Sequence, residues 1–338
     1  MTAPLGSLLS NALQVCRTRT RPFLIGVVLF GSLVAIISVV SNKNIEGHIW
    51  QGMQRLGIDQ NRMMELQEQL QSGDEGAMEA AMEEMNSTMG GIEGMSDEDR
   101  EALFRKEGLA MMIRVLPVMS LGILAWFIIS VLSGAYFLCF GLEKGKEPTD
   151  ILSKAVPLFF PLLGVWIWSF LRSFAWIPFI GIIPAIILGP RFALAPVILV
   201  NQKKGVLGSV SESYQKTRGY WGKIVGNLIV VGLVCLLVSF GVSLVTIPVA
   251  MTSKVFSIWI HAVAQQAVMG YGVVFLVLLT KTILENSSKI PAKNSVKVPT
   301  NNSFNPMGIA MILIWITVVA FVVLGITGLL FFGIKQFF

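Results

Sequence analysis

The sequence predicts an all-α membrane protein: a polytopic transmembrane helical bundle with a six-helix core, a C-terminal seventh span and a long extracytoplasmic helical loop. Its 338 residues are 54% hydrophobic, and the mean hydropathy is +0.71. Only 14% are charged, whereas about 25% is usual in soluble domains. Several apolar runs exceed about eighteen residues, the length that marks a transmembrane helix. Helices are expected because hydrocarbon offers the backbone no hydrogen-bond partner.

Seven apolar segments are long enough to be spans. They cover residues 22–40, 115–140, 155–171, 176–200, 224–250, 257–284 and 307–334. The first is followed by "SNKNIEG", which lacks the small-residue pattern of a signal-peptide cleavage site. It is therefore predicted to remain in the protein as a span.

The spans divide the chain into four parts. A cytoplasmic amphipathic segment (1–21) precedes a six-span membrane domain (22–284), which contains an extracytoplasmic insertion (41–114). A cytoplasmic linker (285–305), rich in Ser, Asn, Lys and Pro, leads to a C-terminal transmembrane helix (306–338). Apolar residues in the first part recur at helical spacing, which predicts a helix on the membrane surface. These residues are Leu5, Leu8, Leu9, Ala12, Leu13 and Cys16.

Basic residues predict the orientation, because short cytoplasmic loops carry an excess of Lys and Arg. With the N-terminus in the cytoplasm, fifteen basic and five acidic residues fall on the cytoplasmic side. The insertion holds the other fifteen acidic residues and seven basic ones. The pI of about 9.3 is thus attributed to bases that face anionic lipid headgroups, and no nucleic-acid partner is expected.

No sequence motif indicates catalysis. P-loop, G-x-S-x-G, H-E-x-x-H and G-x-G-x-x-G patterns are absent, and the predicted spans contain no Asp or Glu for a proton relay. Cys16, Cys139 and Cys235 lie in apolar helices, without metal-site spacing and without an implied disulfide. We therefore expect a non-enzymatic protein with no catalytic residue, no cofactor and no metal ion.

The centre of the insertion, "MEAAMEEMNSTM", places four methionines on one helical face. They are Met78, Met82, Met85 and Met89. Two interpretations stay open: thioether sulfurs suit Cu(I), and an amphipathic helix would rest the same face on the membrane or a partner helix. Farther on, "SDED" predicts a helix that starts at Ser96 and continues into the second span.

The stretch "RFALAPVILVNQKKGVLGSVSESYQKTRGYW" begins with an arginine in the fourth span. Arg191 lies eleven residues before Gln202, or about 16 Å along a straight helix, which is near the middle of a hydrocarbon core of about 30 Å. Prolines at 178, 184, 190 and 196 predict a kinked or broken helix instead. We expect the Arg191 side chain to face inward and bind carbonyls, hydroxyls or amides, either as a structural clamp or as a ligand contact.

The polar continuation of this stretch is predicted to be a helix in the cytoplasmic interface. Val206, Leu207, Val210, Tyr214 and Trp221 fall close to one face. The nearby basic residues can reach lipid headgroups, and the aromatic pair before the fifth span marks its entry into the bilayer.

A second candidate site lies near the outer end of the sixth span. His261 and Gln265 are four residues apart and share one helical face. Together with Arg172 and Lys254, which are predicted on the same side, they can form an anion or headgroup site. The alternative is a histidine whose hydrogen bonds serve only the fold.

The long stretch quoted above resembles the signature of the YciC-type family of bacterial inner-membrane proteins. It is similar, more distantly, to the membrane domain attached to some glycerophosphodiester phosphodiesterases. The matching residues are Leu194, Ala195, Pro196 and Val197, then Lys203, Lys204 and Gly205, then Ser213, Tyr214, Thr217 and Arg218. The resemblance covers about residues 1–284 and implies a six-helix bundle of the inner membrane. The methionine-rich insertion and the seventh span depart from it, and the chain carries no phosphodiesterase catalytic domain.

These observations favour a multi-pass protein of the bacterial inner membrane that acts in envelope maintenance. Its expected partners are membrane lipids, with a membrane protein or a second copy of the chain as further possibilities. The alternative function is a transporter or permease for an anionic or lipidic substrate, built around Arg191. An intramembrane enzyme is the least favoured class, because no acid–base pair is present.

Overall fold

The computed structural model describes residues 5–55, 97–177 and 180–288. Within these ranges every regular element is a helix, which confirms the all-α class for the part of the chain described. In chain order the elements are α1 (Leu5–Thr18), α2 (Thr20–Arg55), α5 (Asp97–Gly141), α6 (Pro148–Ala155), η1 (Val156–Leu158), α7 (Phe159–Arg172), α8 (Ile182–Phe192), α9 (Ala195–Gln202), α10 (Val206–Lys216), α11 (Trp221–Thr252) and α12 (Lys254–Ser288). The seventh span, the linker and the methionine face lie outside the described residues.

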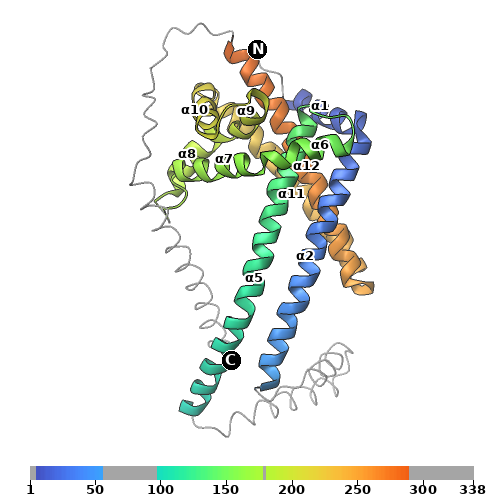
Figure 1. Cartoon of the computed structure of the whole chain (residues 1–338), viewed down its shortest axis with the longest axis vertical. Helices are drawn as coiled ribbons and strands as arrows, with labels where there is room; N and C mark the ends of the chain where they lie inside the picture. The colour runs from blue at the N-terminus through green and yellow to red at the C-terminus, as the bar shows by residue number, and fades with distance from the viewer. Residues whose placement is uncertain (1–4, 56–96, 178–179, 289–338) are drawn as a thin grey trace.

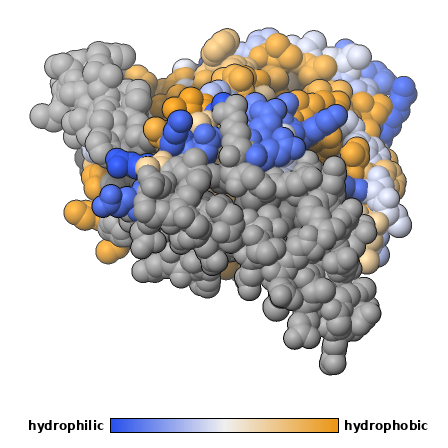
Figure 2. All heavy atoms as spheres, turned by 90° about the horizontal axis from the view of Figure 1, so that it is seen from below, coloured by the Kyte–Doolittle hydropathy of each residue, from blue (hydrophilic) through white to orange (hydrophobic). Residues whose placement is uncertain are grey.

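Six helical segments are long and apolar enough to cross a membrane. They are Thr20–Gly52, Arg105–Gly141, Pro148–Arg172, Ile182–Gln202, Trp221–Thr252 and Lys254–Asn286. Large apolar side chains are exposed along them, and Leu237 of α11 and Ile183 of α8 are 66% and 68% exposed. Figure 2 shows such hydrophobic surface on the sides of the molecule, with polar residues gathered among it. Lipid is the environment that suits this surface, so the prediction of a multi-pass membrane protein is confirmed.

The core of the bundle lies between α2, α5 and α12, with α11 packed against α12 (Figure 1). Glycines allow close approach of these helices, as small residues do in membranes. A methyl group added at Gly31 would lie 2.6 Å from the Val263 Cα, and one added at Gly270 would lie 2.7 Å from the Phe137 ring. Backbone and aromatic rings therefore occupy the space that larger side chains would need.

A cluster of aromatic rings fills this core toward the end of the bundle where α1 lies, here called the α1 end. Phe30 of α2 meets Tyr136 of α5 with ring centroids 5.6 Å apart, and Phe23 meets Phe137 and Phe140 at 5.7 and 5.6 Å. The Tyr136 hydroxyl donates to the Pro22 carbonyl at 2.7 Å. These rings, called the aromatic cluster below, join α2 to α5.

Two helices extend beyond their predicted apolar spans. Helix α2 continues to Arg55, and α5 begins at Asp97 and runs without a break to Gly141, as the "SDED" pattern predicts. The two stay adjacent in their extensions, since a methyl group at Gly52 would lie 3.4 Å from the Met111 side chain. Part of the predicted insertion is therefore a continuation of the helical pair.

The third and fourth apolar segments are divided into short helices. Pro157 falls in η1, between α6 and α7, and the fourth segment breaks between α8 and α9 at residues 193 and 194. Pro190 lies inside α8 and Pro196 in the first turn of α9, which bears out the prediction of a broken helix. Figure 1 shows α6 and α7 running across the bundle, at a steep angle to α2 and α5.

The amphipathic helix α1 packs against protein with its apolar face. Leu8, Ala12 and Cys16 are buried, chiefly against α12, and the Tyr271 hydroxyl of α12 donates to the Leu9 carbonyl at 3.2 Å. Burial raises the pKa of the Cys16 thiol to about 11. The sequence predicts this helix and its apolar face, but the face lies on a neighbouring helix rather than only on the membrane surface.

Replacing Gly31 with alanine should destabilise the bundle by roughly 1–3 kcal/mol, because the added methyl group meets the α12 backbone. Gly232→Ala on α11 is the matched control, since no atom lies within 4 Å of the added methyl group there. Thermal unfolding in detergent measures both. Equal melting temperatures for the two variants would contradict the close α2–α12 contact.

Candidate functional site

A pocket of about 580 Å³ opens between four of the long helices. Its polar lining comes from α2, α5, α11 and α12: Ser38, Ser130, Thr246, Ser257, His261, Gln265 and Gln266. We call it the intramembrane pocket. The structure thus brings His261 and Gln265 together, as their spacing predicts, and adds five polar side chains to them.

Hydrogen bonds between helices fix the two amides of the pocket. The Ser133 hydroxyl of α5 donates to Gln266 Oε1 at 2.6 Å, and both side chains are buried. The Ser239 hydroxyl of α11 lies 3.3 Å from Gln265 Oε1 and donates to it. Each amide still has its N–H groups available for a further acceptor. Gln266 is therefore both a structural link and a wall of the pocket.

The remaining lining is apolar and comes from Val34, Trp126, Ile258, Ala262 and Met269. Among the described residues, no Asp, Glu, Lys or Arg lines the pocket. Phe30 of the aromatic cluster lies one helical turn before Val34 on α2. The result is a cavity that combines apolar side chains with amides, hydroxyls and one imidazole.

The basic residues predicted to join His261 and Gln265 lie elsewhere. Arg172 is at the end of α7, with its guanidinium 5.9 Å from the centroid of the Trp168 ring. Lys254, at the start of α12, forms an ion pair with Glu46 in the extension of α2. Neither residue lines the intramembrane pocket. The affinity for anions that these two cations would give a site is therefore not expected of this pocket.

Arg191 lies at a second location, beside α10. Its carbonyl is in the last turn of α8, where helical carbonyls lack an N–H partner. The Ser213 hydroxyl donates to this oxygen at 2.6 Å. The Thr217 hydroxyl, which donates to the Tyr214 carbonyl at 3.1 Å, lies 3.4 Å from the same oxygen. Ser213 and Thr217 are fully buried; Ser213 is in α10 and Thr217 caps its C-terminal end, four residues farther on.

The Arg191 side chain is held by an aromatic ring. Its guanidinium carbon lies 5.0 Å from the centroid of the Tyr214 ring, which stacks on Phe192 at 6.0 Å. Nε is buried and has no hydrogen-bond partner among the described residues. The sequence predicts hydrogen bonds to the side chain of Arg191, but the hydroxyls of α10 bind its main-chain oxygen.

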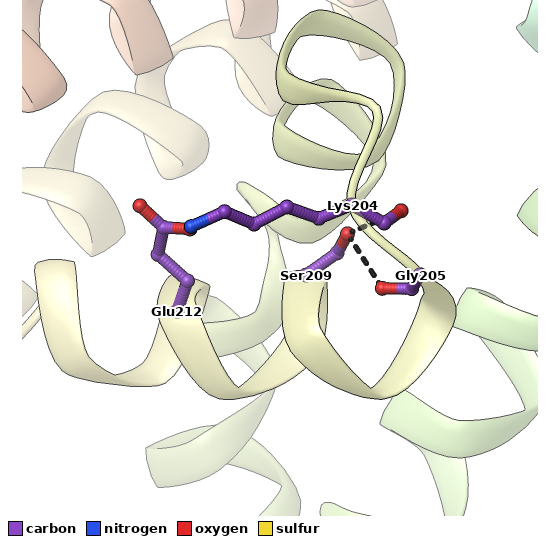
Figure 3. A network of polar contacts seen from close by, with 4 residues as sticks. All are labelled: Lys204, Gly205, Ser209 and Glu212. Atoms are coloured by element: carbon purple, nitrogen blue, oxygen red, sulfur yellow. Dashed lines mark hydrogen bonds and ion pairs between the residues drawn. The ribbon is translucent and has the colours of Figure 1, made fainter.

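Helix α10 packs mainly through a face of small residues. Ser209, Val210 and Ser213 are buried, whereas Leu207 and Tyr214 are exposed. Of the predicted apolar face, Val210 thus packs inside the protein, whereas Leu207 and Tyr214 lie on the protein surface. Figure 3 shows the start of the helix, where the Ser209 hydroxyl donates to the Gly205 carbonyl at 3.0 Å and Lys204 pairs with Glu212.

Three basic residues that sequence reasoning used only to set orientation bind main-chain carbonyls. Arg19 donates to the Phe140 carbonyl at 2.6 Å and to that of Gly145. Lys144 donates to the carbonyl of Val200, and Lys154 donates to that of Lys144. Burial lowers the pKa of Lys144. Their position near helix C-termini is the signal that could have revealed this role.

Comparison with known protein families, curated proteins and solved structures identifies no relative of this chain. No family model, no curated protein and no solved structure matches this chain. Among the described residues no group of three or more His, Cys, Asp or Glu could hold a metal ion. The fold fits an integral, multi-pass helical membrane protein, with a cavity between its helices.

Ser133→Ala should destabilise the protein by roughly 1 kcal/mol, because it leaves the buried Gln266 oxygen without its donor. Ser120→Ala is the control, since that hydroxyl is exposed and donates within its own helix, to the Leu116 carbonyl. The free energy of unfolding in mixed micelles measures the difference. A Ser133→Ala variant as stable as Ser120→Ala would mean that the hydrogen bond does not join α5 to α12.

Proposed function

We propose that this chain is a non-enzymatic protein that binds an amphipathic lipid in the intramembrane pocket and so serves the maintenance of a bacterial cell envelope. The observation that carries the proposal is the pocket itself, a cavity of about 580 Å³ lined by amides, hydroxyls and one imidazole. Binding cavities of small molecules commonly have volumes of about 300–1,000 Å³. The volume therefore suits the polar part of a lipid and the start of its chains.

The chemistry of the lining selects the class of ligand. Gln265 and Gln266 offer N–H donors, and the serine and threonine hydroxyls both donate and accept. Because no Asp, Glu, Lys or Arg of the described part of the chain lines the pocket, ester, hydroxyl and amide groups fit it better than a bare phosphate. The apolar side chains of Trp126, Ile258 and Met269 provide the contact surface that acyl chains need.

Binding, rather than catalysis, is the activity that this lining supports. Among the described residues, His261 contributes the one imidazole of the lining. A single imidazole without a carboxylate or a second base beside it in the lining offers no acid–base pair. We propose the orientation with the N-terminus in the cytoplasm, in which the pocket lies in the outer half of the bilayer.

The second candidate function is a permease, favoured by the break between α8 and α9. Broken helices at membrane depth commonly surround transport sites. The membership of a YciC-type family remains a proposal, supported by the role of Ser213, Tyr214 and Thr217 as one contact group around Arg191.

Filling the pocket should abolish lipid retention. Ala262 is buried and lines the pocket, so Ala262→Phe places a ring where the lipid would lie. Native mass spectrometry of protein washed with detergent to remove loosely bound lipid should show one lipid still bound to the wild type. The same measurement should show no bound lipid for this variant. Gln265→Leu should weaken retention roughly fivefold, the equivalent of one hydrogen bond.

Gln215→Leu on α10 is the control for Gln265→Leu, because it makes the same substitution at an exposed position outside the pocket. Melting temperatures confirm that each variant is folded. Retention of the same lipid by wild type and by folded Ala262→Phe would refute the proposal.

A further inference from the structure

The side chain of Arg191 is held in place but not neutralised. The two hydroxyls of α10 fix its main chain, and the Tyr214 ring lies 5.0 Å from its guanidinium carbon. No carboxylate of the described residues forms a salt bridge with it, and its nearest acidic neighbour along α10, Glu212, pairs with Lys204. A fixed, uncompensated cation in a lipid-facing region favours an anion as its partner.

The donors of this guanidinium are left for a ligand. Nε is buried without a partner, and the residue as a whole is only partly covered. Nε itself has no surface open to a ligand, so a phosphate would bind the terminal N–H groups of the guanidinium. The planar fork of arginine matches two phosphate oxygens, and the stacked ring beneath it limits its movement.

An apolar strip leads away from Arg191 along α8. Ile187 and Ile183 precede it by four and eight residues, and so lie along the same side of the helix. They are 45% and 68% exposed. Trp221 adjoins the strip, since its indole N–H donates to the Ile187 carbonyl at 2.9 Å, and tryptophan is typical of the membrane interface. A phosphate at Arg191 with hydrocarbon along α8 is the arrangement of a phospholipid.

We propose that Arg191 and Tyr214 form a binding site for the phosphate of an anionic phospholipid, whose acyl chain lies along Ile187 and Ile183 of α8. This site is separate from the intramembrane pocket and takes a different ligand chemistry, because the pocket is lined by neutral groups. The net negative charge of the lipid compensates the guanidinium, which a zwitterionic lipid does less well.

The test uses the full chain in detergent with added phosphatidylglycerol, phosphatidylcholine or inorganic phosphate. Phosphatidylglycerol should raise the melting temperature of the wild type more than phosphatidylcholine does. Arg191→Gln should weaken this binding roughly tenfold or more, because it removes the charge and the fork. Arg218→Gln is the matched control, with the same change of charge on an exposed residue just beyond α10, and should change affinity less than about twofold.

A second variant makes the result independent of the folding of Arg191→Gln. Tyr214→Leu removes the ring but leaves the hydroxyl bonds to the Arg191 carbonyl, and it should also weaken the binding, whereas Tyr214→Phe should retain it. Inorganic phosphate should not replace the lipid, because it makes no contact with α8. Equal effects of Arg191→Gln and Arg218→Gln, or equal stabilisation by the three ligands, would overturn the proposal without affecting the pocket.

Discussion

The carbonyl groups at the ends of helices constrain this structure, because the last turn of a helix leaves them without an intrahelical N–H partner. Side chains of the protein bind three of these oxygens. Helix α5 ends with the Phe140 carbonyl bound by Arg19, α8 with the Arg191 carbonyl bound by Ser213 and Thr217, and α9 with the Val200 carbonyl bound by Lys144. Each of these contacts joins segments far apart in the sequence. The ends of α5, α8 and α9 are therefore held by Arg19, which lies between α1 and α2, by Ser213 of α10 and by Lys144 of the loop after α5.

The same constraint decides where Arg191 lies. A straight fourth span would place its guanidinium near the middle of the bilayer, but the break at residues 193 and 194 brings α8 against α10 instead. The hydroxyls that secure the break also place the Tyr214 ring at the guanidinium. If the third and fourth segments each cross the bilayer, the chain returns to the side from which it started. If both stay on one side, the chain also ends on that side. The direction in which α11 and α12 cross the membrane is the same in both cases. The orientation predicted from the basic residues is thus insensitive to the path of α6 to α9.

The sequence predicts those features that depend on local pattern. Apolar length predicts α11 and α12 to within a few residues, "SDED" predicts the start of α5, and the prolines predict the break in the fourth segment. Features that depend on contact between distant residues could not be predicted. Gln266 meets a serine 133 residues away, and no periodicity indicates that pairing. For Arg191 the sequence indicates that polar partners are needed, but only the tertiary arrangement decides that they bind the carbonyl rather than the side chain.

The two candidate sites differ in charge because they differ in what surrounds them. A cation at the depth of the intramembrane pocket would cost about 2.5 kcal/mol or more without a partner, whereas amides and hydroxyls can satisfy each other across helices when no ligand is bound, as Gln265 and Ser239 do. Neutral groups are therefore the polar groups that a cavity between spans can hold at low cost. A guanidinium is tolerated at Arg191 because Tyr214 covers one face of it and the fork remains accessible to headgroups. A ligand of the pocket must thus bring neutral hydrogen-bonding groups, and a ligand of Arg191 must bring the missing negative charge.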